Sequence, residues 1–240
     1  MKNLLLQAVF IAATALMSCN ISSGERIDGN GNLKSENRKI GNATKINVLG
    51  DIDVFVEVGS TALRVEADEN LLPYIETVEE DGWLRIKTRD HTNINTGKSI
   101  KVYITTPTLR GVSVDGSGNL KGSGSFSSVD NMSLNVSGSG NINLQVNAPK
   151  VESAISGSGN LHVAGETRDV EVHISGSGNY DGPDLKAENA SVSIAGSGDA
   201  HLFADVNLKA SIAGSGNVKY KGNASVEQSI AGSGSVQKIQ

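Results

Sequence analysis

Residues 155–161 read Ile-Ser-Gly-Ser-Gly-Asn-Leu, and this stretch decides the fold because its central Gly-Ser-Gly-Asn tetrapeptide keeps returning. Seven exact or near copies begin at residues 116, 138, 157, 176, 196, 214 and 232, at intervals of 22, 19, 19, 20, 18 and 18 residues. Repetition at a nearly constant period is the signature of a solenoid, in which each repeat stacks on its neighbours. The sequence therefore predicts a repeat solenoid over residues 111–240.

Alignment of the copies on their first glycine places apolar residues in two columns. The column two positions before that glycine consists of Val114, Val136, Ile155, Ile174, Ile194, Ile212 and Ile230. The column four positions after it consists of Leu120, Ile142, Leu161, Tyr180, Ala200, Val218 and Val236. Mostly polar residues alternate with these columns, which is the period-two pattern of a strand with one buried face. We expect the columns to form a continuous interior stack.

The tetrapeptide itself is typical of a sharp turn. Glycine reaches positive φ without steric cost, and asparagine tolerates the left-handed region better than most residues. Stacked turns would also let polar side chains hydrogen-bond along a ladder. The residues that we assign to these structural turns are Gly116, Gly118, Asn119, Gly138, Gly140, Asn141, Gly157, Gly159, Asn160, Gly176, Gly178, Asn179, Gly196, Gly198, Asp199, Gly214, Gly216, Asn217, Gly232 and Gly234.

Each repeat of about 20 residues, which we call a rung, is predicted to contain a strand, a bend and a second strand. This matches one coil of a parallel β-helix-like solenoid, so the predicted fold class is all-β. Residues 39–110 lack the tetrapeptide but contain five alternating stretches, at 46–49, 51–58, 63–67, 83–87 and 99–105. Terminal repeats of solenoids are atypical because they cover the open end of the core. We interpret 39–110 as an N-terminal β-rich cap with the first coils. A separate β-sandwich over 39–110 is the alternative.

The N-terminal residues resemble a localisation signal. Residues 1–18 have one early lysine, a core of about a dozen apolar residues and a small residue at the end, as a secretory signal peptide does. Leu16-Met17-Ser18-Cys19 resembles a bacterial lipobox, and Cys19 is the single cysteine of the chain. We expect lipidation of Cys19 and attachment to a membrane through it. Residues 19–38 are polar and rich in Gly, Asn and Ser, which predicts a flexible tether.

The chain resembles the auto-transporter adhesin "head GIN domain" family of bacterial envelope lipoproteins. The features that carry the resemblance are the lipobox, the tether, the stretch from Ile104 to Asn119 and the serial Gly-Ser-Gly-Asn copies. The resemblance covers about residues 38–238. It implies a right-handed β-helix-like fold and an adhesin-type role. From the lipobox and the resemblance together, we expect localisation in the bacterial cell envelope, as an outer-membrane lipoprotein facing the periplasm or the cell surface. The resemblance supplies no catalytic or binding residues.

One outward column carries the candidate metal ligands. Five positions after each first glycine stand Lys121, Asn143, His162, Asp181, His201, Lys219 and Gln237. Stacking in register would place His162, Asp181 and His201 on consecutive rungs, near enough to share a metal with zinc-type ligands. Exposed columns collect polar residues by default, and Asp181-Gly-Pro-Asp184 suggests a bulge that would spoil the register. We therefore predict no metal site, with these three residues as the weak candidates.

Composition excludes some function classes. The formal charge of 21 − 26 = −5, without a basic cluster, argues against nucleic-acid binding. Acidic residues of the repeat region are scattered, and the cluster of Glu166, Arg168, Asp169 and Glu171 is best explained as a solvated bend. We predict no catalytic residue and no cofactor.

The sequence favours an adhesin-like binding or structural scaffold, with a glycan or protein surface as the ligand. A polysaccharide-processing enzyme and a purely structural envelope component are the alternatives. The chain stops at Gln240, soon after the last copy, so a homo-oligomer formed through an open end is also expected.

Overall fold

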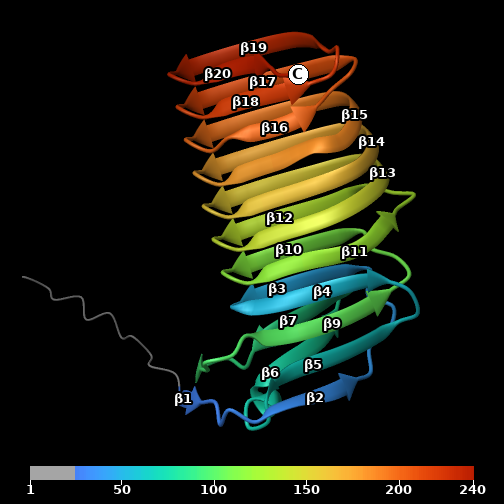
Figure 1. Cartoon of the computed structure of the whole chain (residues 1–240), viewed down its shortest axis with the longest axis vertical. Coiled ribbons are helices and arrows are strands. Elements are labelled where there is room, and N and C mark those ends of the chain that lie inside the picture. The colour runs from blue at the N-terminus through green and yellow to red at the C-terminus, as the bar shows by residue number, and fades with distance from the viewer. Residues whose placement is uncertain (1–24) are drawn as a thin grey trace, which may run out of the picture.

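The computed structural model describes residues 25–240 and consists of strands with a single 3₁₀ turn, η1 (Leu72–Tyr74). Eighteen strands form one continuous sheet, and β1 (Glu25–Asp28) and β8 (Thr92–Asn95) form a separate two-stranded sheet. The long axis is a stack of coils with the N-terminal cap at one end and the C-terminus at the other (Figure 1). Within residues 25–240, no helix has the length and apolarity needed to cross a membrane.

The repeat region is a β-solenoid of about six turns with rungs of about 20 residues, as the sequence predicts. Strands of successive rungs pair in parallel, and residues one period apart are direct partners. The strands are β10 (Gly111–Gly116), β11 (Asn119–Ser127), β12 (Met132–Gly138), β13 (Asn141–Gly157), β14 (Asn160–Gly176), β15 (Asn179–Gly196), β16 (Ala200–Phe203), β17 (Asn207–Gly214), β18 (Asn217–Lys221), β19 (Ser225–Gly232) and β20 (Ser235–Lys238).

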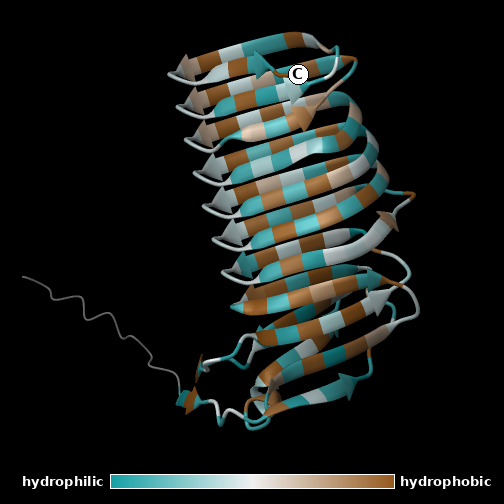
Figure 2. Ribbon diagram, viewed as in Figure 1, coloured by the Kyte–Doolittle hydropathy of each residue, from teal (hydrophilic) through white to brown (hydrophobic). Residues whose placement is uncertain are grey.

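The interior of the solenoid is the predicted stack of columns. Ile155 pairs with Ile174, which pairs with Ile194, and all three are buried. Hydrophobic and hydrophilic residues alternate along each ribbon because successive side chains point to opposite faces (Figure 2). The prediction is wrong at the last coil, where Ile230 is 38% exposed. Ile230 stacks on Ile212 on one side, but within residues 25–240 no strand pairs with the other edge of β19.

Each tetrapeptide lies at a corner where neighbouring backbones touch. The first glycine has positive φ in every copy, for example 120° at Gly176. The amides of Ser177 and Gly178 both donate to the carbonyl of Gly157 on the preceding rung, at 2.8 and 3.0 Å. Asparagine side chains continue this contact outside the corner, since Asn179 Nδ2 donates to Asn160 Oδ1 at 3.0 Å. The corner therefore joins rungs through both backbone and side chains.

The asparagine ladder is almost continuous along the solenoid. Each member donates to the member one rung earlier, over distances of 2.7 to 3.0 Å between Asn119 and Asn179. It starts on the cap, where Asn119 Nδ2 donates to Asp53 Oδ1 at 2.8 Å. It continues through Asp199 and Asn217 to the hydroxyl of Ser235. Repeated amides satisfy one another in this way because the rungs stack in register.

Residues 39–110 form the cap and share the sheet and core of the solenoid, so they are not a separate β-sandwich. β3 pairs in parallel with β10, and β4 pairs in parallel with β9 and β11. These pairings extend the coil from the repeat region into the cap. Antiparallel pairs β6–β7 and β5–β9 complete the end. The strands are β3 (Lys45–Gly50), β4 (Ile52–Val58), β5 (Ala62–Asp68), β6 (Ile75–Glu80), β7 (Trp83–Thr88) and β9 (Ile100–Thr106).

The flexible tether predicted for residues 19–38 is corrected for residues 25–38, which form β1 and β2 (Leu33–Arg38). β2 pairs antiparallel with β5, and the guanidinium of Arg38 donates to the carbonyl of Leu72 at 2.9 Å. The strand carries no apolar alternation because its side chains are mostly exposed, so hydrophobic periodicity gives no signal for it. The predicted signal peptide, residues 1–18, and Cys19 lie outside the described residues.

Candidate functional site

The predicted outward column is a straight row of exposed or half-buried side chains across the solenoid. Register pairs Lys121 with Asn143, Asn143 with His162, and so on to Gln237. Each residue lies beside an interior apolar neighbour, for example Leu161 next to His162, so strand alternation turns the row outward. The row is therefore a surface feature of the stacked strands.

His162, Asp181 and His201 are brought together as their spacing predicts. His162 Nδ1 lies 2.9 Å from Asp181 Oδ2, and His201 Nδ1 lies 3.8 Å from Asp181 Oδ1. The expected bulge is present, but it shifts the register between His162 and Ala164 and leaves the His162–Asp181 pair intact. The described part of the chain contains no group of three or more His, Cys, Asp or Glu side chains able to hold a metal ion. The arrangement is a hydrogen-bonded pair with a histidine neighbour.

The same row continues into the cap, where the repeat no longer marks it. Lys121 pairs with Phe55, Phe55 with Tyr103, Tyr103 with Arg64, and Arg64 with Asn37. We call the whole set the outer row; it consists of Asn37, Arg64, Tyr103, Phe55, Lys121, Asn143, His162, Asp181, His201, Lys219 and Gln237.

Stacked π systems form the cap end of the outer row. The rings of Phe55 and Tyr103 are stacked, with centroids 5.2 Å apart and planes 18° from parallel. The guanidinium carbon of Arg64 lies 4.0 Å from the centroid of Tyr103, in a cation–π contact. Phe55 is 37% exposed, so part of its ring is open to solvent and to a ligand. These aromatic residues stand at polar positions of alternating strands, and that is the sequence signal that could have identified them.

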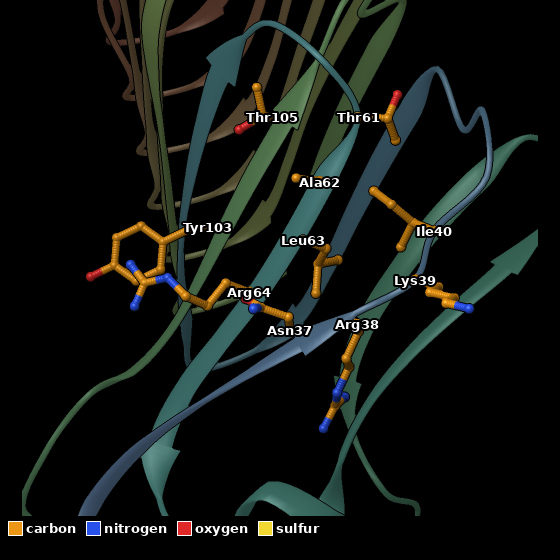
Figure 3. A pocket seen from close by; sticks show the side chains of 10 residues that line it. All are labelled: Asn37, Arg38, Lys39, Ile40, Thr61, Ala62, Leu63, Arg64, Tyr103 and Thr105. Atoms are coloured by element: carbon orange, nitrogen blue, oxygen red, sulfur yellow. The ribbon is translucent and has the colours of Figure 1, made fainter.

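Two hollows border this end of the outer row. One, of about 220 Å³, is lined by Phe55, Tyr103, Lys121 and neighbouring residues. The other, of about 630 Å³, is lined by the segment from Asn37 to Ile40 together with Arg64 and Tyr103, whose side chains lie next to each other in Figure 3. Aromatic faces, amides and cations in shallow hollows can stack on apolar surfaces and hydrogen-bond to hydroxyls or anionic groups.

The cluster of Glu166, Arg168, Asp169 and Glu171 lies within β14, four to nine residues after the outer-row residue His162 on the same strand. Hydrogen bonds from Asn189 and Arg168 hold the pKa of Asp169 below its usual value. Lys150, at 2.8 Å, and His173, at 2.9 Å, lower the pKa of Glu171. A general acid for glycoside cleavage needs a raised pKa, so these shifts have the opposite direction.

Known proteins share this architecture. A family model described as "Putative auto-transporter adhesin, head GIN domain" matches residues 42–224. A solved structure described as a putative adhesin from Bacteroides fragilis is 24% identical, with a TM-score of 0.82 over 89% of this chain and 100% of that chain.

Two solved structures from Parabacteroides distasonis also match. One is described as a putative adhesin, is 28% identical and has a TM-score of 0.73 over 90% of this chain and 100% of that chain. The other is described as a putative lipid binding protein, is 29% identical and has a TM-score of 0.74 over the same shares of the two chains. Comparison with functionally curated proteins gives no match.

Proposed function

Because the chain belongs to the family described as "Putative auto-transporter adhesin, head GIN domain", we propose that it is a cell-envelope lipoprotein with an adhesin-like β-helical head. The head acts as a rigid binding scaffold, and the outer row is its binding face. A solenoid suits this role because stacked repeats present an extended surface on which weak contacts add up.

The outer row is the observation that carries the proposal. Its eleven residues stand on strands paired side by side, so the spacing of their backbone positions is set by the sheet and no backbone order has to be created on binding. Its chemistry changes along the row from an aromatic and cationic end at Arg64, Tyr103 and Phe55 to amides and histidines. This order suits an extended glycan or an extended protein surface whose groups meet successive rungs.

Lipidation would hold the cap end of the head near the membrane. Cys19 precedes the first residue of β1, Glu25, by 25 − 19 = 6 positions. A chain of that length spans at most about 20 Å when fully extended. The outer row would then begin close to the bilayer and run away from it along the solenoid, with its orientation set by the head.

The anchor is tested by Cys19→Ser. We expect this variant to move from the membrane fraction to the soluble fraction, because no lipid can be attached to the serine at that position. A matched Ser18→Ala variant should stay with the membrane, since it leaves the cysteine and a small preceding residue in place. Membrane association of Cys19→Ser equal to that of the wild type would refute lipid anchoring.

The binding face is tested on an array of glycans and host-matrix proteins. For any ligand that the wild type binds, Arg64→Ala should weaken binding by about fivefold or more, because it removes a cation from the outer row and uncovers the ring of Tyr103. Arg89→Ala is the matched control, since Arg89 lies over Tyr74 with its guanidinium carbon 5.1 Å from the ring centroid, outside the outer row. Equal losses in the two variants, with melting temperatures unchanged, would contradict the proposed face.

A further inference from the structure

The outer row carries an excess of positive charge on an acidic chain. Its charged members are the cations Arg64, Lys121 and Lys219 and a single carboxylate, Asp181, whereas the whole chain has a formal net charge of −5. From Asn37 at the cap end to His162, the row contains no carboxylate at all. A local stretch of one sign attracts ligands of the opposite sign. The row therefore favours an anionic ligand, although the chain as a whole repels one.

The cations of the outer row keep donors that no other residue uses. The ammonium groups of Lys121 and Lys219 take part in no ion pair and no side-chain hydrogen bond among residues 25–240. Arg64 Nη1 donates to Ser35 Oγ at 3.0 Å and to Glu66 Oε2 at 3.1 Å. The Nε and Nη2 donors of Arg64 have no acceptor in the same part of the chain, so its guanidinium can still donate to a carboxylate or a sulfate.

The carboxylates closest to the row are held by other partners. Asp181 Oδ2 lies 2.9 Å from His162 Nδ1, so this acid is engaged within the row itself. Asp53 and Asp199 belong to the neighbouring asparagine ladder and accept hydrogen bonds from its amides at 2.8 and 3.0 Å. These contacts reduce the repulsion that the three acids exert on an anion lying over the row.

The row is narrow, which limits the shape of its ligand. On the flank away from the ladder, Glu57 and Asp184 are exposed, so a broad anionic surface would meet their charges. A thin extended chain centred on the row would meet the row residues one after another, at about 4.8 Å per strand. Between the cations, it would contact amides, histidines and the rings of Phe55 and Tyr103, which suit hydroxyls and apolar sugar faces. The ligand with these properties is thin, hydroxylated and acidic.

We propose that the outer row binds an acidic polysaccharide. Its carboxylate or sulfate groups pair with Arg64, Lys121 and Lys219, and its hydroxyls hydrogen-bond to the amides and histidines between them. The inference rests on the proposed function, since it takes the outer row as the binding face and names the class of ligand. Single-stranded nucleic acid fits less well because its binding needs a basic surface that contacts many phosphates.

The class of ligand is tested with pairs of polysaccharides that differ in charge. The purified full chain is titrated with polygalacturonate, alginate, hyaluronan and chondroitin sulfate, each beside a neutral derivative made by esterification and, for the last, also by desulfation. We expect at least one acidic member to bind about tenfold or more tightly than its neutral derivative, and NaCl to reduce this preference. The proposal is overturned if no acidic member binds more tightly than its derivative, or if oligothymidylate binds as tightly as the best acidic member.

Charge variants of opposite sign locate the binding of the best acidic polysaccharide. Lys121→Gln should weaken it by about threefold or more, and Asp181→Asn should strengthen it by about twofold or more, because the first removes a cation of the row and the second its only carboxylate. Lys209→Gln is the control, since Lys209 is 69% exposed on β17, outside the outer row. A shift in the same direction for Lys121→Gln and Asp181→Asn, or an equal loss in Lys209→Gln, overturns the assignment.

Arg64→Ala separates a failure of this inference from a failure of the proposed function. A neutral glycan or a protein that binds the wild type and loses affinity in Arg64→Ala, with no acidic polysaccharide bound, overturns the acidic class and leaves the outer row as the binding face. An acidic polysaccharide that binds Arg64→Ala and Lys121→Gln as tightly as the wild type overturns both.

Discussion

Gly176→Ala is expected to lower the free energy of unfolding by about 3 to 5 kcal/mol. Two costs add at this corner. Gly176 has a φ of 120°, which residues with a Cβ rarely adopt. The new Cβ would also overlap the carbonyl oxygen of Gly157, which already accepts hydrogen bonds from Ser177 and Gly178. Equilibrium denaturation with urea measures the loss.

Two other glycines separate the costs. Gly50 has a φ of 91° but open space where a Cβ would stand, so Gly50→Ala should cost about 1 to 2 kcal/mol from backbone strain alone. Gly97 has neither positive φ nor a close neighbour, and Gly97→Ala should change stability by less than about 0.5 kcal/mol. If Gly176→Ala costs no more than Gly50→Ala, close approach of the backbones is not what selects glycine at the corners.

Ile174→Ala is expected to cost about 2 to 5 kcal/mol, because it opens a cavity in the middle of the interior stack. Ile174 is 2% exposed and lies between Ile155 and Ile194 on the neighbouring rungs. The packing on both sides is fixed by backbone pairing, so the stack cannot easily collapse into the space. Chemical denaturation should show this loss as a lower midpoint of unfolding with an unchanged m-value.

The last coil provides a control of the same residue type in the same column. Ile230 stacks on Ile212 but is 38% exposed, so Ile230→Ala should cost less than about 1.5 kcal/mol. The difference between the two variants measures the contribution of a second covering rung. Equal losses would contradict the structure, either because Ile174 is less enclosed or because Ile230 is covered in solution.

Most of the solenoid could be predicted from the sequence because its contacts repeat. Residues one period apart become neighbours, so the spacing of the tetrapeptide already states which residues pair, as in Ile155, Ile174 and Ile194. The same spacing predicts that His162, Asp181 and His201 share one row. The bulge after Asp181 disturbs this row less than expected, because the register shift between β14 and β15 falls just past the His162–Asp181 pair.

The spacing of the repeats predicts neither how the strands of the cap pair nor that residues 25–38 form strands. β2 is stabilised by backbone pairing with β5 and by the contacts of Arg38, and neither leaves an apolar pattern in the sequence. The aromatic end of the outer row depends on pairings between β4, β5 and β9, whose partners are separated by unequal loops. No period links Phe55 to Tyr103, so their stacking was not visible before the strands were placed.

The amino-acid sequence by itself determined the all-β solenoid, its rung length, its interior columns and its glycine corners. Those features are set by local spacing, since one period of chain brings each residue back over its counterpart. Tertiary structure alone decided which cap residues extend the outer row. These residues meet through pairing of segments between 64 − 37 = 27 and 121 − 55 = 66 residues apart, and the free energy of such pairing depends on the whole packed cap rather than on any short stretch of sequence.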